Sequence, residues 1–229
     1  GPEFASTVGL RKEPRTGFSF AVFGGANLFE SLSGTLDSQA IVPPGILTTV
    51  GTKASADSTI EPVGGLKLRY DWPFDPEPIE QFSDELQGRP LHLGAALEAE
   101  AFYLGGKISA NTSTQGVSTS LNSAVFMLNP LLTLQTGKWR PYIGPGVGFA
   151  YIDATGYNNP ATTQTSATQT ALAIQGEAGV DYFFVQDWSI FAEYKYLVFN
   201  NFNLFDSPAK IDASRLDNHI LTMGLRKTF

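Results

Sequence analysis

The end of the chain, Asn218-His-Ile-Leu-Thr-Met-Gly-Leu-Arg-Lys-Thr-Phe229, alternates apolar with small or polar residues up to its last position. In an extended strand, every second side chain lies on the same face. One face therefore holds Phe229, Leu225, Met223 and Leu221, with Lys227 as the charged exception. The other face holds Thr228, Arg226, Gly224 and Thr222. This period of two predicts a β-strand with one apolar face.

Composition narrows the class of protein. The chain has 229 residues and a mean hydropathy of -0.05, and no window holds the roughly 18 apolar residues that a transmembrane helix needs. Any membrane span must therefore be β. The 23 Gly and 12% aromatic residues, with only 16% charged residues, are typical of many strands with one lipid-facing side. The lack of Cys excludes disulfides, and the formal charge of -7 argues against a nucleic-acid surface.

The same alternation recurs along the chain and predicts eight strands. The predicted strands are residues 17–29, 63–72, 91–104, 121–135, 138–153, 171–185, 188–199 and 218–229. Long polar connections follow the first, third, fifth and seventh strands, the first of them covering residues 30–58, whereas the fourth and sixth strands end in tight turns. The connection over residues 73–90 breaks this asymmetry, and we expect a short helical turn within it, around residues 79–86.

Turn length predicts the pairing of residues across the sixth and seventh strands. A three-residue loop over 185–187 pairs Phe184 with Trp188 on the apolar face and Glu177 with Lys195 on the polar face. Glu193 and Arg226, on adjacent strands, are a second expected ion pair.

A second tight turn makes a similar prediction for the fourth and fifth strands. A two-residue loop at Thr136 and Gly137 pairs Leu134 with Trp139 on the apolar face. It also pairs Thr133 with Arg140 on the polar face.

The apolar face could be either the inside or the outside of a barrel. A soluble barrel such as a lipocalin turns it inward, so periodicity alone does not decide. Here the apolar face is large and aromatic on all eight strands, too bulky for a small barrel's interior, while Gly144, Gly146 and Gly148 lie on the polar face. We therefore predict that the apolar face contacts lipid. Pro130 and Pro145 then point outward, and a bulge is expected near them because a closed barrel has no edge to absorb a missing N–H.

The polar face then becomes the lumen, and its charged side chains are predicted to form a plugging network. Charges removed from water must be paired. The predicted lumen network is Lys67, Arg69, Glu98, Glu100, Arg140, Glu177, Asp181, Glu193, Lys195 and Arg226, with Asp71 on the same face.

All three tryptophans lie where strands meet the tight-turn end. Trp72, Trp139 and Trp188, with Phe229 at the same end, are predicted to mark one membrane interface. The alternative is ordinary core packing, although a soluble core would favour Trp in mid-strand.

Three segments resemble strands of the small OmpA/OmpX-like bacterial outer-membrane β-barrels. Residues 139–151 (WRPYIGPGVGFAY) resemble the family's PY-x-G-x-G-x-G strand, and residues 188–196 (WSIFAEYKY) its EYRY-like strand. Residues 219–229 are similar to the closing strand with its terminal aromatic, although Lys227 replaces the usual aromatic two positions earlier. The resemblance covers the C-terminal half; the first half matches by pattern alone.

The resemblance implies an all-β fold, an eight-stranded antiparallel up-and-down transmembrane β-barrel in the bacterial outer membrane with both termini periplasmic. Residues 1–4 read as an expression remnant, so we expect the natural chain to begin near Ala5, after removal of a secretion signal. Residues 5–16 are then a periplasmic segment and residues 17–229 a single barrel domain. Expected partners are outer-membrane lipids and the barrel-insertion machinery, through the strand that ends at Phe229.

The fold does not determine the function. We expect a structural, surface-exposed role; the alternatives are a small porin-like pore or a barrel whose loops bind an extracellular ligand or act as an adhesin. The apolar run of residues 41–47 within a polar loop could serve such binding or pack on the barrel mouth. The expected state is a monomer without nucleic acid.

A lipid hydrolase is a weaker alternative, because such an enzyme needs a nucleophile with a His partner at the outer rim. Only His92 and His219 exist, and His92 lies at the tight-turn end, where we expect a lumen hydrogen bond near the acids. His219 is expected to point outward at the interface. We therefore predict no catalytic residues, no metal site and no cofactor.

Overall fold

The computed structural model describes residues 16–29, 33–42, 46–55, 60–74, 91–111, 116–158, 163–204 and 209–229. Three regions with sequence-based predictions lie outside these ranges: the N-terminal segment up to residue 15, the expected helical turn at residues 79–86, and the centre of the apolar run, residues 43–45. In the described residues no helix is long and apolar enough to span a membrane.

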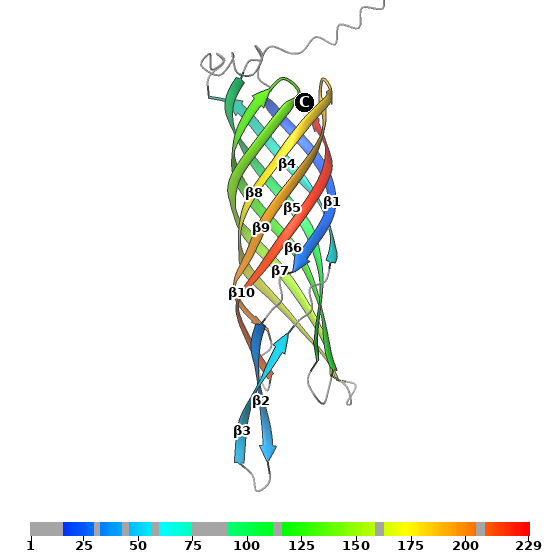
Figure 1. The fold of residues 1–229 in the computed structure, drawn as a ribbon, viewed down its shortest axis with the longest axis vertical. Helices are drawn as coiled ribbons and strands as arrows, with labels where there is room; N and C mark the ends of the chain where they lie inside the picture. The colour runs from blue at the N-terminus through cyan, green and yellow to red at the C-terminus, as the bar shows by residue number, and fades with distance from the viewer. Residues whose placement is uncertain are drawn as a thin grey trace, which may run out of the picture.

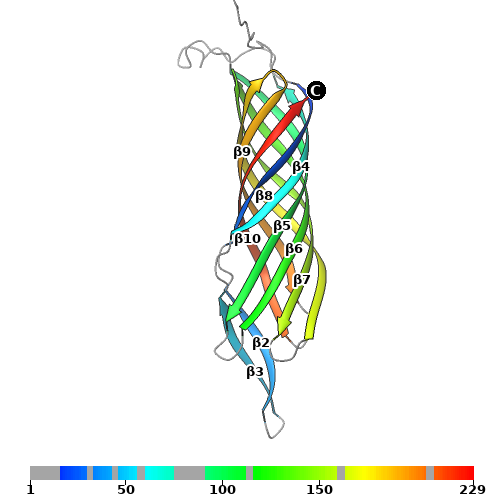
Figure 2. The ribbon, with the colours of Figure 1, turned by 90° about the vertical axis from the view of Figure 1, so that its right-hand side faces the viewer.

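The described residues form ten strands in one sheet. The strands are β1 Gly17–Phe29, β2 Ser33–Val42, β3 Ile46–Ser55, β4 Ile60–Pro73, β5 Leu91–Asn111, β6 Gly116–Thr136, β7 Trp139–Asn158, β8 Thr163–Val185, β9 Trp188–Leu204 and β10 Ala209–Thr228. β1 and β4 to β10 pair with their neighbours in antiparallel fashion, and β10 pairs with β1. The result is the predicted eight-stranded closed barrel (Figures 1 and 2).

β1 has its predicted bounds, whereas the other seven barrel strands are longer than the alternating pattern predicts, and the first long connection is not a simple loop. β2 and β3 pair with each other as antiparallel strands, which we call the β2–β3 hairpin, and β2 pairs with β10 through Ala209 with Ser38 and Lys210 with Asp37. The hairpin extends from the barrel end opposite the tight turns (Figure 1). Apolar alternation reports only where one face meets lipid, whereas the hydrogen-bonded ladder continues wherever neighbouring strands remain paired.

The turn between β8 and β9 confirms most of the predicted register. Glu177 lies opposite Lys195, as expected. The turn itself is shorter than predicted, because Val185 pairs with Trp188 and a register shift follows between Phe183 and Val185. Phe184 is therefore the extra residue of a bulge rather than the partner of Trp188.

The predicted register between β6 and β7 was wrong by two residues. Thr136 pairs with Trp139 around a turn in which Gly137 has φ of 58°, a left-handed conformation that glycine adopts without strain. Thr133 consequently pairs with Tyr142 rather than Arg140. A shift of two residues keeps every side chain on its predicted face, so the inside and the outside of the barrel are unaffected.

The bulge expected near the two prolines is absent from the described β6–β7 ladder. Pairing stops after Leu128 with Val147 and resumes at Leu132 with Ile143 in the same register, so neither strand carries an extra residue. Pro130 and Pro145 both face outward and are exposed, as predicted. The missing proline N–H groups therefore interrupt the ladder without shifting it.

Burial alternates along the strands and confirms which face is outside. Large apolar side chains such as Phe20, Leu68, Val147 and Ile190 are exposed, each with at least 40% of its surface accessible. The charged side chains of the opposite face are buried in the barrel. The barrel thus has an apolar outer surface and buried charged side chains inside, the arrangement that a lipid environment requires.

Candidate functional site

The barrel interior is the candidate functional site, because it gathers the charged side chains of six strands. Among the described residues, five basic and six acidic side chains are buried there. They comprise all ten residues of the predicted network together with Asp71. Each is placed inward by the period of two of its own strand.

The charged interior has two tiers, and the tier nearer the tight turns contains the arginines. Arg69 donates from Nε and Nη2 to Asp71 Oδ1, at 2.9 and 2.7 Å. Arg140 donates from Nε to Asp181 Oδ2 at 3.0 Å, and its Nη1 lies 3.2 Å from Asp71 Oδ2. Arg226 Nε lies 3.3 Å from Asp181 Oδ1. We call these five residues the arginine tier; three cations there share two carboxylates.

The second tier lies deeper in the barrel and contains the lysines. Lys67 Nζ donates to Glu98 Oε1 at 2.6 Å and to Glu193 Oε2 at 2.7 Å. Lys195 Nζ donates to Glu100 and lies 3.2 Å from Glu193 Oε1. With Glu177, these residues form the lysine tier, in which two cations face four acids. Arg226 Nη2 donates to Glu98 at 3.2 Å and joins the two tiers.

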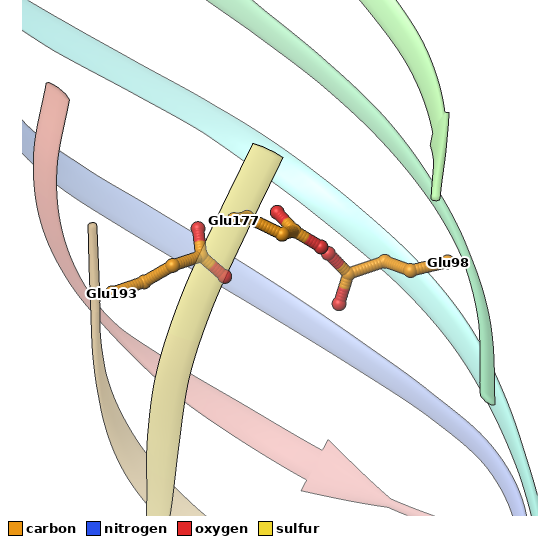
Figure 3. A group of neighbouring side chains, drawn as sticks. All are labelled: Glu98, Glu177 and Glu193. Atoms are coloured by element: carbon orange, nitrogen blue, oxygen red, sulfur yellow. The ribbon is translucent and has the colours of Figure 1, made fainter. Parts of the chain in front are cut away.

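Three acids of the lysine tier meet at one point. Glu98 from β5, Glu177 from β8 and Glu193 from β9 place carboxylate oxygens within 4.8 Å of one another (Figure 3). Oxygen ligands of this kind suit a hard cation. Here, however, the Lys67 ammonium contacts Glu98 and Glu193 and lies 3.7 Å from Glu177. The geometry therefore fits an ammonium group, and the absence of a metal site stays a prediction.

One of the two expected ion pairs is present and the other is wrong. Lys195 Nζ lies 3.9 Å from Glu177 Oε2, but its closer partners are Glu100 and Glu193. Glu193 and Arg226 have no ion pair among the described contacts, because Glu193 reaches Lys67 and Arg226 reaches Glu98. Register identifies neighbours along the wall, whereas long side chains in a narrow lumen meet partners from other strands.

Neutral polar residues that the sequence did not single out complete the network. Tyr142 Oη donates to Glu193 Oε2 at 2.8 Å. Gln175 Nε2 donates to Asn129 Oδ1 at 2.9 Å, and Asn129 Nδ2 donates to Glu100 Oε2 at 3.2 Å. All three lie at inward positions of the alternating pattern, which is the signal by which they could have been found.

The prediction of a small and polar lumen covers only part of the barrel. Beyond the lysine tier the interior is mostly apolar, and its buried apolar side chains belong to one cluster, beside which Asn27 and Asn218 form a buried hydrogen bond. The members of this cluster, which we call the apolar tier, are Ala21, Phe23, Val63, Phe102, Leu104, Val125, Met127, Ala150, Ile152, Ala171, Ala173, Phe191, Leu197, Phe199 and Ile220. Two of them lie alongside the charged tiers, because Ala21 pairs with Lys67 and Phe191 with Asp181. These residues continue the inward alternation of the charged positions, but no charge marks them in the sequence.

The lysine tier and the apolar tier meet at aromatic rings. Phe23 and Phe102 have ring centroids 6.3 Å apart. Lys195 Nζ lies 5.0 Å from both centroids, and Lys67 Nζ lies 5.6 Å from those of Phe23 and Phe191. These distances are in the range of cation–π attraction, so the ring faces contact the ammonium groups at the boundary.

The outer rim at the tight-turn end carries the predicted aromatic residues. Trp72, Trp139, Trp188 and Phe229 are all exposed on the outer surface. Lys227, at the position where the resembled family has an aromatic, lies 3.3 Å from Asp187 and 5.5 Å from the Trp188 ring. The charge is thus held at the rim, as expected of a lysine at an interface.

The two histidines occupy different environments. His92 is buried at the tight-turn end, but neither ring nitrogen has a hydrogen-bond partner in the described residues, so the expected lumen hydrogen bond is not seen. His219 lies beside outward-facing tyrosines: its Nδ1 is 2.6 Å from Tyr194 Oη, and its ring lies 5.1 Å from that of Tyr196. The expected outward position of His219 is confirmed.

Comparison with solved structures returns small outer-membrane barrels at low sequence identity. Neisserial surface protein A is 13% identical with a TM-score of 0.46, over 93% of this chain and 98% of that one. Ail of Yersinia pestis, in complex with a heparin analogue, is 13% identical with a TM-score of 0.41, over 93% and 99% of the two chains. The N-terminal β-barrel domain of Pseudomonas aeruginosa OprF is 13% identical with a TM-score of 0.38, over 93% and 98%. No curated protein sequence matches significantly.

A family model gives the decisive match. The outer membrane protein beta-barrel domain model matches residues 42–229, which include all of β4 to β10. The barrel closure, the apolar exterior and the buried charges described above agree with such a domain. The chain belongs to the outer membrane protein beta-barrel domain family.

Proposed function

We propose that this protein is a structural scaffold of the bacterial outer membrane that holds extended strands and connections outside the cell. The observation that carries the proposal is the length of the strands relative to their apolar outer band. A tilted transmembrane strand needs about 9–11 residues. β5 to β8 have 20 to 23 residues each.

The outer surface shows where the lipid-facing band ends. On β7 the outward residues are apolar or aromatic from Trp139 to Tyr151, and the next outward residue, Asp153, is charged and exposed. Tyr151 pairs with Thr170 on β8, which is also outward and exposed. Both strands nevertheless continue, to Asn158 and Thr163. Paired strands therefore extend beyond the band at the end opposite the tight turns.

The asymmetry of the two ends supports the orientation. Short turns and the tryptophan rim lie at the end where the chain terminates, and the β2–β3 hairpin lies at the other (Figure 2). Outer-membrane barrels have short periplasmic turns and longer extracellular connections. We therefore assign the tight-turn end to the periplasm, with both ends of the barrel domain on that side.

Partners follow from this assignment. The exposed Phe229 ends β10, the strand that closes the barrel against β1, and this is the segment that we propose the insertion machinery recognises. The extended strands and the β2–β3 hairpin are the proposed surface for an extracellular ligand.

The lumen filled by side chains supports a scaffold role over a pore. The contact of His219 with outward tyrosines supports an interfacial role of this residue over a catalytic one. We further propose that the protein is a monomer.

Single cysteines test the proposal, since the natural residues include none. A membrane-impermeant thiol reagent applied to intact cells should label Asn111→Cys and Tyr157→Cys. It should not label the matched positions Gly137→Cys and Asp187→Cys until the outer membrane is permeabilised. Labelling of Gly137→Cys on intact cells would reverse the orientation and contradict the proposed display of the long strands.

A further inference from the structure

The two halves of the lumen differ in how well their buried polar atoms are satisfied. Beside the apolar tier Asn27 and Asn218 hydrogen-bond each other at 3.0 Å, and one atom there, Asn27 Oδ1, has no hydrogen-bond partner in the described residues. At the tight-turn end, in contrast, several buried polar atoms have no protein hydrogen-bond partner and no ion pair in the described residues. These atoms are Ser19 Oγ, His92 Nδ1 and Nε2, Ser189 Oγ, Arg226 Nη1 and Thr228 Oγ1.

Four of these residues form one continuous patch on the inner wall. Ser189 pairs with Arg226 across β9 and β10, and Ser19 pairs with Thr228 across β1 and β10. Ser19 is also paired with Arg69 of β4, which belongs to the arginine tier. Because inward residues of adjacent strands lie side by side, the unpartnered hydroxyl groups line the wall beside the arginines.

Buried hydroxyl and guanidinium groups are normally satisfied by protein or by ordered water. The patch offers several donors and acceptors close together, which is what a buried water requires. The arginine tier adds three cations to two carboxylates, an excess charge that also favours hydration. The opposite half is lined mainly by alanine, aliphatic, methionine and phenylalanine side chains, which leave water few partners. Its buried polar side chains in the described residues include Ser123 and the hydrogen-bonded pair of Asn27 and Asn218.

We propose that the lumen is a one-ended hydrated chamber: water enters the arginine tier from the tight-turn end, and the apolar tier seals the barrel against passage. The seal begins at Phe23 and Phe102, whose ring centroids both lie 5.0 Å from the Lys195 ammonium nitrogen. The block to ions therefore lies in the apolar tier and not in the charge network. This inference concerns the two ends of the barrel and holds whichever end faces the cell exterior.

Water-edited NMR of the isotope-labelled protein in lipid vesicles tests the hydration directly. Magnetisation should pass from water to the Thr228 methyl and the Arg226 guanidinium, and not to the Met127 and Ala173 methyl groups. Transfer to both halves would mean a continuous wet pore and would overturn the proposal. Transfer to neither half would mean a dry plug and would overturn it as well.

Conductance in planar bilayers tests the position of the seal. The double change Phe23→Ala with Phe102→Ala should produce a steady current. The matched control, Phe20→Ala with Tyr103→Ala, alters outward rings on the same two strands and should not.

A third variant separates the seal from the charges. Lys67→Met with Glu98→Gln neutralises a central pair while leaving the apolar tier intact, and it should remain non-conducting. Each variant is first checked for the heat-modifiable gel mobility of a folded barrel. A steady current through the Lys67→Met/Glu98→Gln variant would refute the inference. The inference would also be refuted if the Phe23→Ala/Phe102→Ala variant conducted no more than its control, because the block would then lie elsewhere.

Discussion

Replacing Lys67 by Met should destabilise the barrel strongly, because this ammonium group is shared by several buried acids. Lys67 lies 2.6 Å from Glu98, 2.7 Å from Glu193 and 3.7 Å from both Glu100 and Glu177, and its side chain is fully buried. The described part of the interior holds six acids for five bases, and the change would leave four bases. Removing one partner of a buried ion pair costs about 3–5 kcal/mol. Met largely preserves the volume, so the loss reports on charge more than on a cavity.

The assay is urea unfolding in lipid vesicles, followed by the gel mobility of the folded form. Lys227→Met is the matched control, since Lys227 forms a partly exposed pair with Asp187 at 3.3 Å and should contribute no more than about 1 kcal/mol. Adding Glu193→Gln to Lys67→Met should recover much of the loss, because it removes one of the four acids of a tier in which Lys195 would be the one remaining ammonium group. If Lys67→Met costs no more than Lys227→Met, the interior charges are solvated and the reasoning fails.

Two further substitutions probe other parts of the interior by the same unfolding assay. Gly179→Ala would place a methyl group 2.6 Å from the Tyr142 ring and should lower the free energy of unfolding by about 1–3 kcal/mol. The control Gly176→Ala, on the same strand, meets nothing within 4 Å and should change the stability little. Equal effects of the two changes would contradict the tight packing at Gly179. Asn27→Ala removes the donor that bonds Asn218 at 3.0 Å in the lumen and should cost about 1–3 kcal/mol; an unchanged stability would show that water replaces it.

The faces of the strands could be predicted because a period of two leaves no freedom once one residue is placed. Glu177 opposite Lys195 follows from strand alternation and turn length, and the structure has that pair. The error at Thr133 arose because the tight turn is centred one position later than predicted, which shifts the register by two residues and leaves the faces unchanged.

Contacts across the lumen could not be predicted in the same way. The Lys67 ammonium from β4 reaches Glu193 of β9, and these two strands are not neighbours in the sheet. Such contacts depend on barrel closure, shear and side-chain length together. The alternating pattern identifies which side chains share the interior, but it does not identify their partners.

The apolar tier was missed for a different reason. Inward positions such as Phe102 and Leu197 follow the same alternation as the charged residues, but apolar side chains then occur on both faces, and the contrast between faces disappears. The alternating pattern does not predict the extensions of β5 to β8 for a similar reason, because the sequence of these extensions lacks an apolar face.

The current carried by the wild-type protein in a planar bilayer tests the central claim, that the barrel is a closed scaffold whose interior is filled by side chains. The account predicts no steady current for folded protein at any moderate voltage, because the apolar tier fills the lumen beyond the charged side chains and blocks the passage of ions. A large and steady current from the folded wild type would contradict it and would favour the pore alternative.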